Sequence, residues 1–172
     1  MADVFTHVLV GFIIGVGLSF RYDWLGPEYV TLVMIGALSP DFVKINLVVP
    51  DAVVAEFLGV PFSWSPLHVL FGTVIVVLLG SLLLAPEYRK RAVALFVVGA
   101  VSHHVLDVMV LNVTGYSYAL FWPVTAYNPP AGNLYLSSDR WPIVVAGVVA
   151  AVVWFMRYRV YGGLWSGVGR DG

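Results

Sequence analysis

The chain has 172 residues, of which 60% are hydrophobic and only 11% are charged. Soluble domains are about half apolar and about one quarter charged, so this composition predicts an integral membrane protein, and the length suits a single domain over residues 1–172. The net charge of −1 excludes the strongly basic surface that is typical of nucleic-acid binding. The absence of cysteine excludes disulfides and thiolate metal sites, so a metal would need His, Asp, Glu or backbone oxygen as ligands.

Five apolar stretches approach the length of about 20 residues that a membrane-spanning helix requires. In chain order they cover roughly residues 4–20, 28–47, 66–85, 92–111 and 141–158. The first has no basic residue ahead of it in Ala2-Asp3-Val4, so we expect a retained span and not a signal peptide. We expect Pro40 to kink the second span. The pattern therefore predicts an all-α, multi-pass bundle of about five transmembrane helices.

Two further stretches join these spans. Residues 51–62 are expected to be interfacial. Residues 112–140 contain the turn-rich run Asn128-Pro129-Pro130-Ala131-Gly132-Asn133 and predict a long loop over the bundle. Aromatic residues are enriched at headgroup level, so we expect four aromatic side chains of this region to lie there: Trp122, Tyr127, Tyr135 and Trp141.

The basic residues predict the orientation of the chain in the membrane. Seven of them follow the first, third or fifth span, namely Arg21, Arg89, Lys90, Arg91, Arg157, Arg159 and Arg170. Only Lys44 and Arg140 fall on the other side. Because basic residues concentrate in cytoplasmic segments, we expect an extracytoplasmic N-terminus and a cytoplasmic C-terminus in the inner membrane.

This topology places the ionisable residues of the spans at a common depth. Charged or titratable groups inside a membrane are costly, so they indicate a functional site. The extracytoplasmic ends of the spans carry His7 (first), Asp41 (second), His68 (third) and Ser102-His103-His104 with Asp107 (fourth). We therefore expect one polar site in the outer leaflet, together with the long loop that covers it.

The spacing within the fourth span predicts metal binding. His103 and Asp107 lie four residues apart, so a helix stacks them on one face, where both can reach one ion. His104 points about 100° away from His103 and, like Ser102, is expected to support the ligands from outside the coordination sphere. Histidine nitrogens with carboxylate oxygens favour zinc, as one ion or two.

Each residue also has a structural alternative. His103 with Asp107 could form a hydrogen-bonded pair that joins helices. His7 could be satisfied by backbone, Asp41 could terminate a helix after Pro40, and His68 could be an interfacial polar residue. The alignment of these residues in depth favours the metal site.

Several motifs resemble a known family when they are taken in order. They are Thr6-His7, Leu38-Ser39-Pro40-Asp41, Leu67-His68, the stretch from Gly99 to Asp107, and Leu120-Phe121-Trp122-Pro123. Together they resemble the YdjM-type membrane-bound metal-dependent hydrolases of prokaryotic inner membranes. The order Asp, His, His-x-x-x-Asp is also similar, more distantly, to a zinc site of zinc-dependent phospholipase C and related nucleases.

This resemblance implies a ligand set and a chemistry. Asp41, His68, His103 and Asp107 would hold one metal ion, Asp107 would bridge to a second ion, and His7 would be a ligand of that second ion. A phosphate-containing substrate is implied as well. The chain departs from the family's usual pattern because residues 62–66 lack its His-Arg pair and because Phe42-Val43 follows Asp41 in place of a second carboxylate. A site with one ion fits these departures better.

We therefore expect a membrane-embedded, metal-dependent hydrolase of an ester or phosphoester, in which Asp107 or His7 holds the attacking water. The depth of the site points to a lipid or lipid-linked substrate. The alternatives are a non-catalytic membrane protein with a structural metal or polar core, and a small transporter. The lack of an internal repeat argues against the transporter. The substrate and the oligomeric state stay open.

Overall fold

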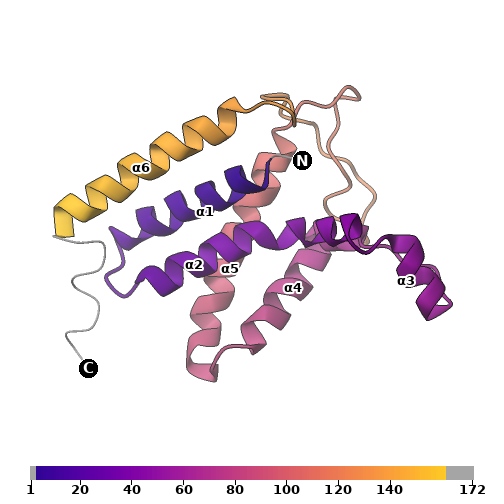
Figure 1. Cartoon of the computed structure of the whole chain (residues 1–172), viewed down its shortest axis with the longest axis horizontal. Coiled ribbons are helices and arrows are strands. Elements are labelled where there is room, and N and C mark those ends of the chain that lie inside the picture. The colour runs from indigo at the N-terminus through magenta and orange to yellow at the C-terminus, as the bar shows by residue number, and fades with distance from the viewer. Residues whose placement is uncertain (1–2, 162–172) are drawn as a thin grey trace.

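The structure is a computed structural model that describes residues 3–161 (Figure 1), so Arg170 of the orientation argument lies outside the described residues. The described chain is helical and contains no strand, as expected. Its elements are α1 (Val4–Ser19), α2 (Pro27–Leu38), the 3-10 helix η1 (Ser39–Leu47), α3 (Asp51–Leu58), the 3-10 helix η2 (Ser65–His68), α4 (Leu70–Leu82), α5 (Pro86–Val108) and α6 (Trp141–Tyr161).

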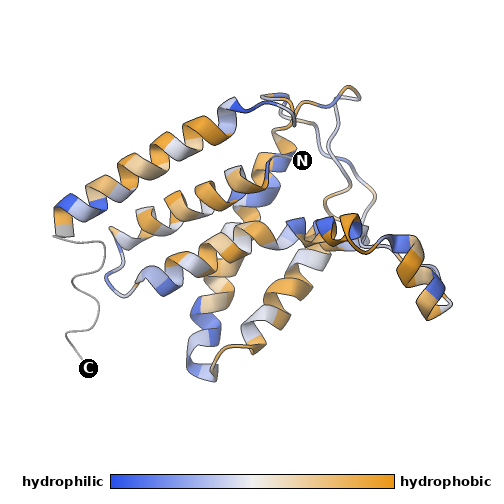
Figure 2. Cartoon of the chain, viewed as in Figure 1, coloured by the Kyte–Doolittle hydropathy of each residue, from blue (hydrophilic) through white to orange (hydrophobic). Residues whose placement is uncertain are grey.

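Among the described residues, three helices are long and apolar enough to cross a membrane: Pro27–Leu47, which joins α2 to η1, then Pro86–Val108 and Trp141–Val160. Helices α1 and α4 are apolar but shorter, with 16 and 13 residues. Apolar residues dominate most of these helices, whereas polar residues gather at helix ends and over the start of α5 (Figure 2).

Two helix starts differ from the predicted spans, near Pro86 and Pro66, and Pro40 marks a change of helix type. Helix α5 begins at Pro86, because proline is favourable in the first turn, and ends at Val108, so it starts before residue 92 and stops before residue 111. The stretch that begins at Pro66 first forms the short η2, and α4 follows only from Leu70. At Pro40 the α-helical geometry of α2 gives way to the tighter turns of η1.

Helix α2 packs between α1 and α5, and α6 covers α1 (Figure 1). The contact between α2 and α5 depends on two glycines. A Cβ atom at Gly99 would overlap the carbonyl oxygen of Val33, and a Cβ atom at Gly36 would overlap that of Phe96. Small residues at such crossings let helix backbones approach closely in membranes. The close approach fixes the end of α2 beside the end of α5.

The long loop after α5 covers that end of the bundle. It is tied down by backbone hydrogen bonds from Leu70 N–H to the Leu120 oxygen (2.9 Å) and from Leu111 N–H to the Tyr135 oxygen (2.7 Å). The Tyr135 side chain is buried against the protein, where its hydroxyl donates to the Leu106 oxygen at 2.7 Å, while its depth in the membrane stays a prediction. Helix α3 projects from the bundle (Figure 1) and buries none of its residues.

Candidate metal centre

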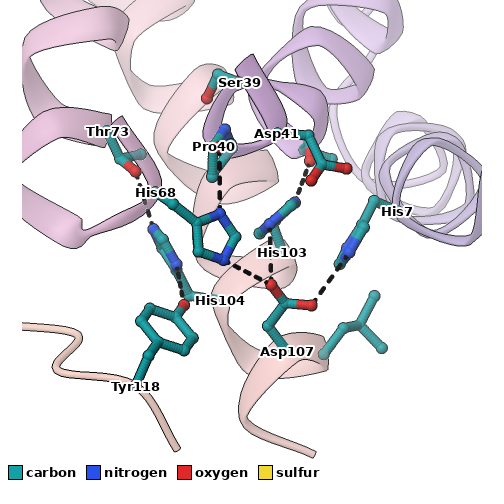
Figure 3. Close-up of polar contacts among 12 residues, drawn as sticks. His7, Ser39, Pro40, Asp41, His68, Thr73, His103, His104, Asp107 and Tyr118 are labelled. Atoms are coloured by element: carbon teal, nitrogen blue, oxygen red, sulfur yellow. Dashed lines mark hydrogen bonds and ion pairs between the residues drawn. The ribbon is translucent and has the colours of Figure 1, made fainter. Parts of the chain in front are cut away.

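Five ionisable side chains from four segments meet where helices of the bundle begin or end (Figure 3). His7 lies in the first turn of α1, Asp41 in η1, and His68 at the end of η2. His103 and Asp107 lie in the last two turns of α5. Ligand atoms of His7, His103 and Asp107 lie within 4.8 Å of one another, and so do those of Asp41, His68 and His103. The structure thus brings together all five residues that the sequence nominated as ligands.

The Asp107 carboxylate lies among the three histidines. Its Oδ2 atom is 2.9 Å from His68 Nε2 and 3.4 Å from His103 Nε2, which is the contact that the four-residue spacing predicts. Its Oδ1 atom is 3.5 Å from His7 Nε2. The rings of His7 and His103 stack with centroids 3.7 Å apart. One carboxylate therefore links α1, η2 and α5.

Backbone carbonyls set the tautomers of two of these histidines. Nδ1 of His68 lies 3.2 Å from the Pro40 oxygen, and Nδ1 of His103 lies 2.8 Å from the Ala37 oxygen. A carbonyl oxygen can only accept, so each Nδ1 carries a proton and donates it. In the neutral rings both Nε2 atoms then present lone pairs toward Asp107, which is itself an acceptor when ionised. A bound cation would satisfy acceptors placed so closely.

The donor set fits a divalent metal ion. His7 and His103 are 0% exposed, and Asp41 and Asp107 are nearly as buried. Within residues 3–161, Nδ1 of His7 has no hydrogen-bond partner, and the Nε2 atoms of His7, His68 and His103 have no partner apart from the Asp107 carboxylate. Buried polar atoms normally have such partners. Zinc and similar ions are usually bound by histidine nitrogens and carboxylate oxygens. The second nitrogen of such a histidine usually donates to a carbonyl or carboxylate, as Nδ1 does here.

Lys44 supplies a positive charge at one edge of the cluster. Its Nζ atom is 2.8 Å from Asp41 Oδ1, and the lysine side chain is 31% exposed. Lys44 contributed only to the predicted orientation, and its pairing with Asp41 was not predicted. The three-residue spacing from Asp41 was the signal that could have found it, because residues three apart are neighbours on a helix.

His104 connects three segments instead of joining the five clustered side chains. Its Nε2 atom lies 3.0 Å from Thr73 Oγ1 of α4, and its Nδ1 atom lies 2.7 Å from the Tyr118 hydroxyl of the loop. Burial first, and the charge of Asp107 second, raise the pKa of Tyr118, so this hydroxyl stays protonated. Ser102 donates to the Gly99 oxygen of its own helix at 2.7 Å. The sequence analysis missed Thr73 and Tyr118, and a lone hydroxyl in an apolar helix or loop offers no clear signal.

A cavity of about 310 Å³ with several polar side chains in its lining opens onto the cluster, and we call it the mouth. It is lined by His68, Asp107, Val110, Asn112, Ser117 and Tyr118. His7, Asp41 and His103 are not among its lining residues, so they lie behind the first two. Water and a polar group can therefore approach the cluster from the side of His68 and Asp107.

Fold and cluster together define a helical membrane protein with a buried His/Asp constellation. The chain belongs to the family described as YdjM inner membrane protein, which matches residues 1–168. This confirms the family that the motifs resemble and assigns the chain to the inner membrane, although the family description names no activity. No curated protein and no solved structure matches the chain.

Proposed function

We propose that this protein is a membrane-embedded, metal-dependent hydrolase of an ester or phosphoester. One observation carries the proposal. The Nε2 atoms of His68 and His103 face Asp107 Oδ2 at 2.9 and 3.4 Å, beside the mouth. In both rings a backbone carbonyl holds the other nitrogen, Nδ1. A structural ion is usually enclosed by its ligands, whereas a catalytic ion keeps one position open. The cavity at His68 and Asp107 favours the open arrangement.

We assign His68, His103, Asp107 and Asp41 to one divalent ion, zinc by the chemistry of the donors, with His7 as the next ligand if a second ion binds. Such an ion supplies Lewis-acid activation and lets water react near neutral pH. Asp107 reaches the mouth and orients the water. His7, which is buried behind it, lies 3.5 Å from Oδ1 and forms with that oxygen the pair that accepts the water proton.

The reaction balances without a further reactant. The water oxygen bonds to the acyl or phosphoryl centre, and the bond from that centre to the alcohol oxygen breaks. The proton held by the Asp107–His7 pair goes to the departing alcohol, and the products are an alcohol and an acid. Surrounding apolar helices limit access of bulk water and strengthen the electrostatic interactions of the site.

The orientation belongs to the same proposal. We place the mouth and the long loop on the extracytoplasmic side, because most basic residues of the described chain lie just after α1, in the first turns of α5 or near the end of α6. Since the chain has no cysteine, single-cysteine variants report orientation directly. A membrane-impermeant maleimide should label Asn112→Cys but not Tyr88→Cys in intact cells. The reverse pattern would invert the topology.

The proposed metal site is tested by measuring how much metal the purified protein contains. The wild type, His103→Ala and Asp107→Ala are purified and analysed by mass spectrometry, with Ser102→Ala as a matched control beside His103. We expect about one ion per chain in the wild type and the control, and strong loss in the two ligand variants. The four proteins are then assayed with p-nitrophenyl esters and bis(p-nitrophenyl) phosphate. Metal content near zero in all four would overturn the proposal.

A non-catalytic polar core is the second candidate, and two observations favour it. Lys44 already neutralises Asp41 from 2.8 Å, and His7 and His103 are fully buried, as in a structural core. In that case chelation would lower thermal stability, or leave it unchanged, while no ester or phosphoester is hydrolysed. Metal-dependent hydrolysis that disappears in His103→Ala would exclude this candidate.

A further inference from the structure

A second and larger cavity lies against the mouth, and we call it the chamber. Its volume is about 590 Å³, and its apolar walls include Val43, Val69, Ala119 and Trp122. His68 and Tyr118 line both the chamber and the mouth. The two cavities therefore adjoin at a histidine of the cluster, and the mouth has the more polar lining of the two.

We propose that the chamber receives one hydrocarbon chain of an amphiphilic substrate while the bond to be cleaved lies in the mouth. The proposal rests on the hydrolase function proposed above and names its substrate class. The volume lies within the range of about 300–1,000 Å³ that is usual for small-molecule sites, which are mostly apolar with few polar groups. An apolar cavity of this kind has no complement for a sugar, a nucleotide or a peptide backbone.

The polar atoms around the chamber have partners of their own. The Ser63 hydroxyl lies 3.1 Å from both Asp51 Oδ2 and Ser65 Oγ. Nδ1 of His68 faces the Pro40 oxygen. None of these groups needs a ligand in the chamber for its hydrogen bonds, which favours an occupant that brings no polar group there.

The wall between chamber and mouth is held in place. The Tyr118 ring lies 4.9 Å from the His68 ring, and its hydroxyl is fixed by His104 Nδ1 at 2.7 Å. The bond from Leu70 N–H to the Leu120 oxygen ties the same stretch of loop to the start of α4. The chamber is thus preformed, and a chain that fills it leaves its polar end beside His68.

The test fills the chamber after the protein has folded. Because the chain lacks cysteine, Ala119→Cys gives one reactive thiol in the wall, and alkyl methanethiosulfonates from methyl to hexyl then fill the space stepwise. Val43→Cys repeats the test from another wall. The matched control is Val76→Cys, which lines a separate apolar groove that touches neither His68 nor Tyr118.

Binding is measured without catalysis, by photolabelling with a diazirine-bearing palmitic acid in lipid nanodiscs. We expect labelled peptides from residues 63–69 and 118–122, with labelling falling as the thiol modification grows at Ala119→Cys or Val43→Cys but not at Val76→Cys. The proposal would be overturned if labelling does not change when either chamber cysteine is modified, or if the chamber and the Val76 groove are labelled equally. Nonselective contact with lipid would then explain the labelling.

Hydrolysis supplies the second readout and separates the two proposals. Hexyl modification of Ala119→Cys should lower turnover of p-nitrophenyl laurate by about tenfold or more, the effect of losing about two buried methylene groups, and spare p-nitrophenyl butyrate. An equal loss of turnover for both esters would overturn the proposed role of the chamber and leave the proposed hydrolase function standing. Chain-selective photolabelling without turnover of either ester would support the chamber and count against the hydrolase.

Discussion

Substitution of Gly99 by alanine should disturb the metal centre from a distance, through the contact between α2 and α5. The added Cβ atom would overlap the Val33 carbonyl oxygen and lie 2.6 Å from the Ala37 amide nitrogen. An ordinary contact starts near 3.4 Å, so the backbones must separate by roughly 0.8 Å at least. Ala37 also accepts the 2.8 Å hydrogen bond from His103 Nδ1, and the same displacement would stretch that bond to about 3.6 Å.

The expected cost follows from these distances. Overpacking of this kind costs about 1–3 kcal/mol, and loss of a buried hydrogen bond adds about 1 kcal/mol. Because His103 would lose the partner that orients its ring, metal affinity should fall by about 10- to 100-fold. The measurements are thermal unfolding in detergent and metal retention against a series of chelators.

Gly17→Ala is the matched control, since the same methyl group there meets no atom within 4 Å. Both substitutions gain about 1 kcal/mol from the higher helix propensity of alanine. The difference in stability between the two variants therefore reports the contact between α2 and α5. The reasoning is refuted if Gly99→Ala unfolds at the temperature of Gly17→Ala and retains its metal equally well.

Three further predictions concern the surroundings of the cluster. Tyr118→Phe removes the hydroxyl at His104 Nδ1 and should cost about 1 kcal/mol of stability without changing metal content, whereas metal loss would show that His104 acts on the ligands. Lys44→Ala should lower the unfolding temperature of chelator-treated protein more than that of metal-loaded protein, because an ion at Asp41 can replace the lysine charge. The control Lys44→Arg should behave as wild type. Equal losses of unfolding temperature in the chelated and metal-loaded forms of Lys44→Ala would contradict this competition. Burial first, and the Asp107 charge second, raise the pKa of Tyr135 from 10.0 to about 12, so its contribution to stability should be complete below pH 10 and fade toward pH 12. The free energy of unfolding, measured from pH 10 to pH 12, should show this pH dependence in the wild type and lose it in Tyr135→Phe. Identical pH profiles for the two proteins would refute the prediction.

Much of the candidate site could be predicted because its residues are chemically out of place. A histidine or aspartate in an apolar helix is costly, so His103 and Asp107 stood out, and their helical spacing predicted a shared face. Topology then predicted that His7, Asp41 and His68 belong at the same end. The structure brings these five side chains together, while their roles as ligands stay predictions.

The position of Tyr135 illustrates where such reasoning ended. An aromatic residue in a loop between spans indicates the headgroup region, yet this ring is buried and its hydroxyl donates to the Leu106 oxygen. The choice between exposure and burial depends on the path of the long loop between α5 and α6, residues 109–140, over the helix ends. No local pattern encodes that path, because it is set by hydrogen bonds between segments far apart in the chain.

By itself, the sequence determined the membrane class, the helices and the identity of the ionisable residues, since composition, periodicity and the cost of buried charge are local properties. Only the tertiary structure decided which atoms face one another. The tautomers of His68 and His103 follow from the Pro40 and Ala37 carbonyls. His104 is directed toward Thr73 and Tyr118 by helix and loop packing. Such pairings depend on distances of a few tenths of an ångström between separate segments, and only a packed fold defines those distances.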